Sequence, residues 1–180
     1  MTTEEYAKEY LTQEIQAIEN SNRLNVLTEL TVYEKAIIYK YSEDGYLDLN
    51  ERLRISKGKD ISDFGLLLDE FLSKLPDYQG IVFRGVNLPK YKIDEYFIKF
   101  ERKERVIENA FLSTSLKTSE AYKYGTTVLQ IFSRTGKSVE SISRYPYEKE
   151  ILFRYNRQFE IVAIDFDKED NKYFTVLEEI

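Results

Sequence analysis

The pattern of apolar residues changes between Pro76 and Gly80, and this change constrains the fold more than any other feature of the sequence. Before it, apolar residues recur at three- and four-residue intervals, as they do on the buried face of a helix. After it, short runs of β-branched and aromatic residues alternate with polar turns, which is typical of strands. A chain with its helices first and its strands afterwards is predicted to have an α+β fold with a mostly antiparallel or mixed sheet system.

The first part of the chain is predicted to be helical. Thr2 with Glu5, and Thr31 with Glu34, have the spacing of a capping box, which marks the first turn of a helix. Pro76 comes after the last helical pattern, where a helix should already have ended. Helices are expected over residues 3–19, 31–41, 46–53 and 61–75, with Ser42–Gly45 as a turn.

The second part is predicted to be mainly β-structure. Strands are expected over residues 81–86, 109–115, 126–132, 151–153, 158–166 and 173–177, with short helices near 93–97 and 118–122. Arg134–Lys137 is expected to be a turn. No stretch is rich enough in Pro or Ser to be a flexible linker. We therefore expect one domain over residues 1–180, with a mainly helical part (1–77) and a mainly β part (78–180).

The composition excludes several kinds of chemistry. The 180 residues include no Cys and no His. Without His, a His-containing catalytic triad is impossible and a zinc centre is not expected, so acid–base or electrostatic work must come from carboxylates. The net charge of -6 does not favour binding to nucleic acid or to an anionic membrane, and no apolar run is long enough to span a bilayer.

The segment from Tyr145 to Phe153 carries a pair of carboxylates in an aromatic and apolar setting. A proline-containing turn leads through Glu148-Lys149-Glu150 into an apolar run. In an extended segment, Glu148 and Glu150 are expected to point the same way, with Lys149 opposite. Because two like charges on one face oppose each other, the pair is either a solvated strand end or two carboxylates aimed at one developing positive charge.

Two further polar motifs lie on predicted strands. Arg84 precedes Gly85 near the end of one strand, and Ser113-Thr114-Ser115 follows an apolar pair in another. Taken alone, such an arginine is usually in a surface ion pair, and such a Ser-Thr-Ser is usually an edge strand or a capping turn. The occurrence of all three motifs in this order indicates that they serve one site.

In this order the motifs resemble those of the mono-ADP-ribosyltransferases of the Arg–Ser–Glu class, which include actin-modifying bacterial binary toxins and related exoenzymes. Upstream, Tyr41-x4-Tyr46-x3-Asn50 looks like the helical element that flanks the NAD pocket in that family. The resemblance covers about residues 31–164. It implies the family's fold, in which a helical part packs on a core of two antiparallel or mixed β-sheets. It also implies NAD⁺ as a co-substrate and no metal.

The resemblance implies a role for each motif residue. Glu150 would stabilise the oxocarbenium-like transition state of NAD⁺ cleavage, and Ser113 would hydrogen-bond to Glu150. Arg84 would bind the NAD phosphates. Glu148 would receive the acceptor, and in similar enzymes Glu at this position goes with arginine as the acceptor. Tyr145 matches the aromatic residue of the substrate-recognition turn, while Tyr41, Tyr46 and Asn50 would line the pocket from the helical side.

The resemblance is incomplete on the nicotinamide side of the pocket. A Gln that the family pattern places a few residues after Arg84 is not evident, because Pro89 occupies the region. Tyr122 and Tyr124 are both candidates for stacking on nicotinamide. The contacts to nicotinamide are therefore the least defined part of the expected site.

The function that the resemblance implies is transfer of ADP-ribose from NAD⁺ to an arginine of a target protein. Such a protein would be a bacterial toxin, an injected effector or a phage-encoded modifier, secreted or injected into a target cytoplasm or acting in its own. An immunity or delivery partner would fit it, whereas nucleic acid and membrane are not expected as partners. NAD⁺ hydrolysis or nucleic-acid modification is an alternative activity. A non-catalytic scaffold that binds a partner through its Tyr-rich surface is a further alternative.

Overall fold

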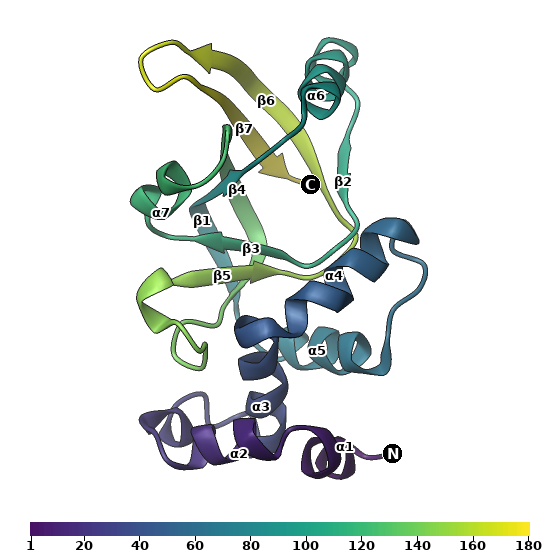
Figure 1. The fold of residues 1–180 in the computed structure, drawn as a ribbon, viewed down its shortest axis with the longest axis vertical. Helices are drawn as coiled ribbons and strands as arrows, with labels where there is room; N and C mark the ends of the chain where they lie inside the picture. The colour runs from purple at the N-terminus through teal and green to yellow at the C-terminus, as the bar shows by residue number, and fades with distance from the viewer.

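The computed structural model describes all 180 residues, and it places a helical part below a β part in the view of Figure 1. The α-helices are α1 (Thr3–Tyr10), α2 (Thr12–Glu19), α3 (Val32–Lys40), α4 (Tyr46–Ile55), α5 (Asp63–Ser73), α6 (Lys90–Arg102) and α7 (Thr118–Lys123). The shorter helical turns are η1 (Asn22–Asn25), η2 (Tyr41–Gly45) and η3 (Pro146–Glu148). The strands are β1 (Asp77–Val86), β2 (Val106–Glu108), β3 (Leu112–Ser115), β4 (Thr127–Ser138), β5 (Glu150–Phe153), β6 (Arg157–Asp167) and β7 (Lys172–Glu179). The predicted α+β class is confirmed.

The helical part follows the predicted pattern with one difference at its start. Both capping boxes are present, at Thr2 and at Thr31. The single helix predicted over residues 3–19 is divided at Leu11, where φ of -127° and ψ of 34° leave the helical region. Leu11 is buried in the core, so the break lets α1 and α2 both pack against α3 instead of running past it.

The predicted turn at Ser42–Gly45 is also helical. These residues belong to η2, a single wide turn of π-helix that joins α3 directly to α4. Lys40 pairs with Asp44 one turn further on, at 2.8 Å, and the Ser42 hydroxyl donates a hydrogen bond of 2.8 Å to the Tyr39 carbonyl. The polar side chains that suggested a turn therefore form their ion pair and hydrogen bond within a helix. The wide turn leads directly into α4.

The strands form one hydrogen-bonded system with the order β1-β3-β5-β4-β7-β6-β2. All pairs are antiparallel except β4 with β7. Two sheets were expected, and here they are joined, because the long strand β4 pairs with β1 along most of its length, with β7 over Thr127–Phe132 and with β5 at its end. This junction brings the ends of β1, β3 and β5 together beside the helical part (Figure 1).

The prediction of a turn at Arg134–Lys137 is wrong, because β4 continues to Ser138. The register between β1 and β4 shifts between Tyr78 and Gly80, so the turn-like composition marks a bulge. The buried carboxylate of Glu179 accepts the backbone N–H groups of Arg134 and Thr135 at 2.6 and 2.7 Å. A side chain at Gly136 would collide with Ile151 and with the Ser133 hydroxyl, which explains the glycine.

The charged segment after residue 89 is more regular than the sequence indicates. A short helix was expected over residues 93–97, but α6 is 13 residues long, and β2 was not expected at all. Ion pairs such as Lys90–Asp94 and Lys92–Glu95 cover the outer face of α6, while Ile93 is buried. The apolar face is narrow and surrounded by charge, so its helical period is hard to recognise.

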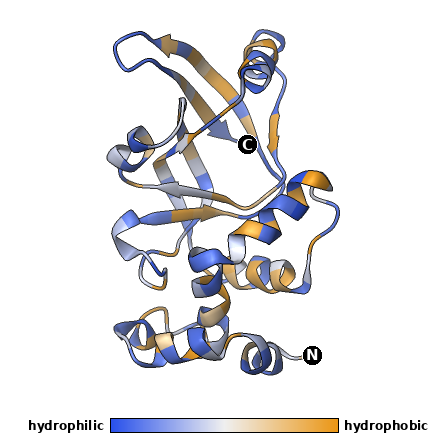
Figure 2. Ribbon diagram, viewed as in Figure 1, coloured by the Kyte–Doolittle hydropathy of each residue, from blue (hydrophilic) through white to orange (hydrophobic).

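One hydrophobic core connects the helical and β parts. It contains Ile37 and Leu68 from the helices together with Phe111, just before β3, and Leu152 in β5. A second cluster lies within the β part around Ile131. Figure 2 shows the corresponding apolar stretches on α5 and along β5. None of the helices is both long and apolar enough to span a membrane.

Candidate active site

A pocket of about 410 Å³ lies where the helical and β parts meet, and it contains the predicted site residues except Tyr122 and Tyr124, the two candidates for contacting nicotinamide. Its lining residues are Tyr41, Ser42, Glu43, Tyr46, Leu47, Asn50, Arg54, Arg84, Ser113, Tyr145, Glu148 and Glu150. The structure therefore brings together side chains that are more than 100 residues apart in the sequence.

Paired strands hold the innermost polar side chains. Ser115 on β3 is opposite both Phe83 on β1 and Glu150 on β5, so the three motifs lie on adjacent strands. The Arg84 guanidinium donates a hydrogen bond of 2.6 Å to the Ser113 carbonyl. Glu150, the first residue of β5, is only 4% exposed.

A glycine after Arg84 is required by the packing of the loop that follows α7. A side chain at Gly85 would lie 2.1 Å from the Ala121 carbonyl oxygen and 2.4 Å from that of Tyr124. Real side chains do not tolerate such distances to backbone atoms. The Arg-Gly motif thus combines a charged side chain in the pocket with a close approach of the α7 segment.

Glu150 is held in an environment that opposes its charge. Burial raises the pKa of its carboxyl from 4.5 to about 7, and the negative charge of Glu148 adds to this rise. The Ser113 hydroxyl, as a hydrogen-bond donor, and the Arg84 cation both lower this pKa. Burial also lowers the pKa of Arg84, but an arginine remains charged at neutral pH. The pocket can therefore hold a carboxylate that is poised to stabilise a positive charge.

Glu148 reaches the pocket in a different way from the one expected. It lies in the helical turn η3 and not in a strand, and Lys149 takes a left-handed conformation with φ of 48°. The Ser115 hydroxyl donates to the Glu148 carbonyl at 2.5 Å, and Leu116 N–H donates to the Lys149 carbonyl at 3.2 Å. Burial raises the pKa of Glu148, and Glu120 raises it further.

The helical wall of the pocket is fixed by a chain of hydrogen bonds. The Asn50 amide donates to the Tyr41 hydroxyl at 3.0 Å and accepts from Phe111 N–H at 3.1 Å. Tyr41 is fully buried and packs edge-on against Tyr46, which is exposed at the mouth. Burial raises the pKa of Tyr41, and the nearby Glu150 charge raises it further. Asn50 thus links α4 to the start of β3.

Arg54 is a lining residue that the sequence analysis missed. It follows Asn50 by four residues on α4 and so lies on the same helix face. Its Nε is 3.9 Å from the Glu108 carboxylate, and its charge lowers the pKa of Arg84. The spacing from Asn50 was the signal that could have identified it. Ser42, Glu43 and Leu47 were also missed, and they belong to η2 and the start of α4.

A smaller pocket of about 130 Å³ adjoins the first and shares Arg84, Ser113 and Glu148 with it. Tyr124 is among its lining residues, whereas Tyr122 is not. Pro89 lies outside both pockets, at the start of α6. No group of three or more His, Cys, Asp or Glu residues is arranged to hold a metal ion.

The fold and the pocket define a protein that presents Arg84, Ser113 and Glu150 from adjacent strands of an α+β core to one pocket. Residues 7–180 match the model of the ADP-ribosyltransferase exoenzyme family. The chain belongs to this family.

Relatives and solved structures extend this assignment. The chain is 37% identical over 151 residues to Mav of Mycobacterium avium (strain 104), covering 81% of this chain and 17% of Mav. It is 30% identical over 154 residues to the NAD(+)–protein-arginine ADP-ribosyltransferase Tre1 of Serratia proteamaculans (strain 568), covering 84% of this chain and 33% of Tre1. Exoenzyme S of Pseudomonas aeruginosa, solved with human 14-3-3 protein beta and Carba-NAD, superposes with a TM-score of 0.75 at 23% identity, over 98% of this chain and 86% of that one. The chain thus has the fold of this solved structure. It spans 17% of the length of Mav and 33% of the length of Tre1.

Proposed function

We propose that this protein transfers ADP-ribose from NAD⁺ to an arginine side chain of a target protein and releases nicotinamide. The observation that carries the proposal is the position of Glu150, buried beside Arg84 and Ser113, with Glu148 beside it in the same pocket. Family membership supports the transferase activity, and the name of Tre1 supports arginine as the acceptor.

In this proposal Glu150 acts on the ribose of NAD⁺. The bond between the anomeric carbon and nicotinamide breaks, and nicotinamide leaves as a neutral molecule with the bonding electrons. Positive charge then develops on the ribose, and the Glu150 carboxylate stabilises it without taking up a proton. Ser113 favours the charged form of Glu150, which this step requires.

The remaining lining residues would hold the dinucleotide. Arg84 and Arg54 supply two guanidinium groups for the two phosphates, since guanidinium binds phosphate oxygens in a bidentate manner. Tyr41, Tyr46 and Asn50 form the helical wall. Tyr124 is favoured over Tyr122 as the aromatic that contacts nicotinamide, because it lines the adjoining pocket.

Glu148 would receive the acceptor arginine. A carboxylate pairs with a guanidinium through two hydrogen bonds and holds it in place. When a guanidine nitrogen attacks the anomeric carbon, that nitrogen loses a proton, and Glu148 is placed to accept it. The raised pKa of Glu148 suits this step, since a stronger base takes the proton more readily.

We further propose that NAD⁺ is the sole co-substrate, that no metal takes part, and that the protein acts as a secreted or injected effector on a target protein. The carboxylates of Glu148 and Glu150 and the guanidinium groups of Arg54 and Arg84, all in the lining of the pocket, supply the charge that the reaction needs. Exoenzyme S was solved in complex with a 14-3-3 protein, which supports the idea that proteins of this fold bind protein partners. NAD⁺ hydrolysis without transfer is the second candidate, favoured by the openness of the Glu148 loop to solvent.

The test is to incubate the protein with isotope-labelled NAD⁺ and a lysate of target cells. The proposal expects label on protein that survives nuclease treatment, and mass spectrometry should map the modification to arginine. Label that nuclease removes, or nicotinamide release with no labelled protein, would contradict it. A Glu150→Gln protein prepared in parallel shows how much label arises without the enzyme.

A further inference from the structure

The loop that carries Tyr145 and Glu148 is tied to the N-terminal part of the chain by one arginine. Arg23 in η1 donates from Nε to the Ile142 carbonyl at 3.0 Å and to the Ser143 carbonyl at 3.2 Å. Its Nη2 donates to the Ser143 carbonyl at 2.9 Å. These bonds join residues 119 and 120 positions apart in the sequence. Arg23 itself is not among the residues that line the pocket.

Arg23 is in turn held firmly by α3. The buried side chain of Lys35, 2% exposed, donates from Nζ to the carbonyls of Arg23 and Leu24 at 3.1 and 2.9 Å. The Arg23 guanidinium also lies over the ring of Tyr39, 5.2 Å from its centre. A buried lysine that bonds only to backbone carbonyls is a costly feature, so it indicates that the position of η1 matters.

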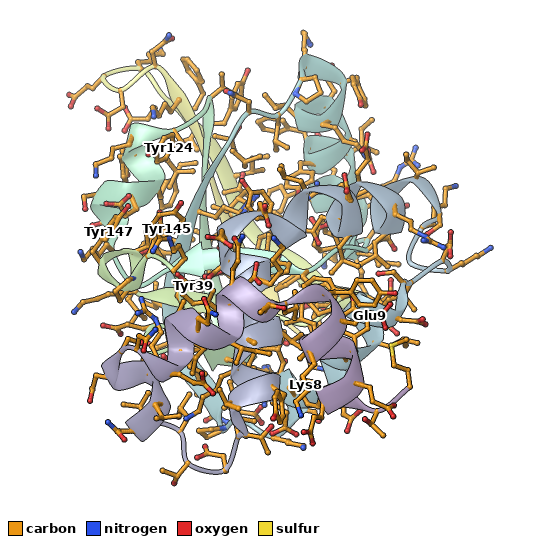
Figure 3. All side chains as sticks on the ribbon, turned by 60° about the horizontal axis from the view of Figure 1, so that its bottom comes forward. Lys8, Glu9, Tyr39, Tyr124, Tyr145 and Tyr147 are labelled. Atoms are coloured by element: carbon orange, nitrogen blue, oxygen red, sulfur yellow. The ribbon has the colours of Figure 1, made fainter.

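The same end of the loop has a second attachment. Arg144 N–H donates to the Ser42 hydroxyl at 2.8 Å, and the Arg144 side chain donates to the Tyr39 hydroxyl at 3.1 Å. Tyr145 N–H donates to the Ser143 hydroxyl at 3.1 Å, so the anchored residues lead directly into Tyr145. Figure 3 shows Tyr39, Tyr145 and Tyr147 on the same side of the molecule.

The far end of the loop is held by the exit of β3. The Ser115 hydroxyl bonds to the Glu148 carbonyl, and the Lys117 side chain bonds to the Tyr147 carbonyl, both at 2.5 Å. The loop is thus held at two ends, with Tyr145 and Pro146 between them. Glu150, Ser113 and Arg84 are held separately, by the pairing of β1, β3 and β5.

We propose that Arg23 is a positioning residue for the acceptor arginine. By fixing Ile142 and Ser143 it holds Tyr145 and Glu148 toward the pocket, so it sets how often the ribosyl cation meets a guanidine instead of water. The inference rests on the proposed function, because it assigns Glu148 to the acceptor. It separates two properties of the enzyme: NAD⁺ cleavage should not need the contact with η1, whereas arginine transfer should.

The experiment measures two rates with purified protein, NAD⁺ and agmatine as a small guanidine acceptor. Nicotinamide release without agmatine reports cleavage, and formation of ADP-ribosyl-agmatine reports transfer. Arg23→Ala removes this attachment, while Arg23→Lys keeps the charge but replaces the two donor atoms Nε and Nη2 with a single ammonium nitrogen. Arg154→Ala is the matched control, because half-buried Arg154 makes two bonds to Asp69 and does not touch the loop.

Arg23→Ala is expected to lower transfer to agmatine about tenfold or more, mainly through a higher KM for agmatine, while nicotinamide release stays within about twofold. Arg23→Lys should lie between Arg23→Ala and the wild type, and Arg154→Ala should leave the ratio of transfer to release unchanged. If circular dichroism shows that Arg23→Ala does not fold, the inference is tested by the ratio of agmatine transfer to nicotinamide release in Arg23→Lys. An unchanged ratio in a folded Arg23 variant would overturn the inference alone. A wild-type protein that releases nicotinamide but never modifies agmatine would overturn the proposed function, and this inference with it.

Discussion

The two halves of the pocket are built in contrasting ways. Arg84, Ser113 and Glu150 lie on adjacent paired strands, and Glu150 is almost completely buried. Tyr145 and Glu148 lie on a loop with one short helical turn, and Tyr145 is 37% exposed. Strand pairing fixes side chains through many backbone hydrogen bonds, whereas the loop depends on a few side-chain contacts. The part proposed to cleave NAD⁺ is therefore rigid, and the part proposed to choose the acceptor is adaptable.

This difference also appears in the electrostatics. Burial raises the pKa of both carboxyl groups, and it raises that of the more deeply buried Glu150 to about 7. A charged group in a dry pocket acts strongly on a developing cation, because little solvent screens it. The same burial makes that charge unfavourable before substrate binds. The strand half of the site thus combines strong catalysis with a cost to stability, and the loop half should show both effects to a smaller degree.

The largest effect should come from Glu150→Gln. Removal of a preorganised charge at the reacting centre is expected to lower both nicotinamide release and arginine transfer by ~10²–10³ or more. Because glutamine has nearly the same shape, the pocket and the affinity for NAD⁺ should be largely retained. Initial rates with saturating NAD⁺ measure the loss, and calorimetric titration of NAD⁺ checks the binding. If Glu150→Gln loses arginine transfer but still releases nicotinamide at the wild-type rate, Glu150 acts on the acceptor and not on NAD⁺ cleavage.

The second effect concerns stability and its dependence on pH. Below pH 4.5 the Glu150 carboxyl is protonated in both the folded and the unfolded chain, so it imposes no penalty. As the pH rises toward 7 the unfolded chain loses this proton first, and folding becomes less favourable by up to about 3 kcal/mol. Glutamine does not titrate, so Glu150→Gln should gain stability relative to the wild type between pH 4.5 and 7.

Chemical denaturation of both proteins at pH 4.5 and pH 8 measures this difference. The comparison of two proteins removes the contributions of all other titrating groups, provided that their pKa values are unchanged. Glu148→Gln serves as the control from the loop, and its stability difference should change much less with pH. An equal pH dependence for the two variants would show that burial of Glu150 does not raise its pKa as described.

The third effect should separate the two halves most directly. Glu148→Gln removes the charge proposed to hold the acceptor, so arginine transfer should fall by about 10- to 100-fold, which corresponds to a lost charge-assisted hydrogen bond. Nicotinamide release without acceptor should stay within about threefold, because the strands still present Glu150. Parallel assays with and without agmatine measure both rates. If Glu148→Gln modifies agmatine as fast as the wild type, the acceptor role of Glu148 is wrong.

The sequence predicted the strand half of the site better than the loop half. The motifs around Arg84, Ser113 and Glu150 lie on or beside short apolar runs, whose alternation and length reflect burial in a sheet. The geometry of Glu148 could not be read in this way. Its position depends on the left-handed conformation of Lys149 and on bonds from residues of the β3 exit, and neither leaves a local pattern.

The incorrect predictions about the fold have the same cause, namely contacts between residues far apart in the sequence. The bulge in β4 has the composition of a turn, and only the distant Glu179 carboxylate explains why Arg134 and Thr135 remain in the strand. Arg54 was missed because an exposed arginine on a helix usually has no special role, and only the fold shows that it lines the same pocket as Arg84. Local periodicity predicts elements, whereas contacts between distant elements decide bulges and sites.

The smallest effect tests whether the exposed aromatic residues of the loop differ from one another. Tyr145 lines the pocket, whereas the neighbouring Tyr147, 60% exposed, does not, although the two rings are only 6.1 Å apart. A guanidinium held against an exposed aromatic ring gains about 0.5–1 kcal/mol, so Tyr145→Ala should lower agmatine transfer about two- to fivefold, mainly in KM. Tyr145→Phe keeps the ring and should retain most of the activity, and Tyr147→Ala should change little. Equal losses of agmatine transfer in Tyr145→Ala and Tyr147→Ala would mean that the loop acts through its overall surface. If Tyr145→Ala lowers nicotinamide release as much as agmatine transfer, Tyr145 contributes to NAD⁺ cleavage and not to binding of the acceptor.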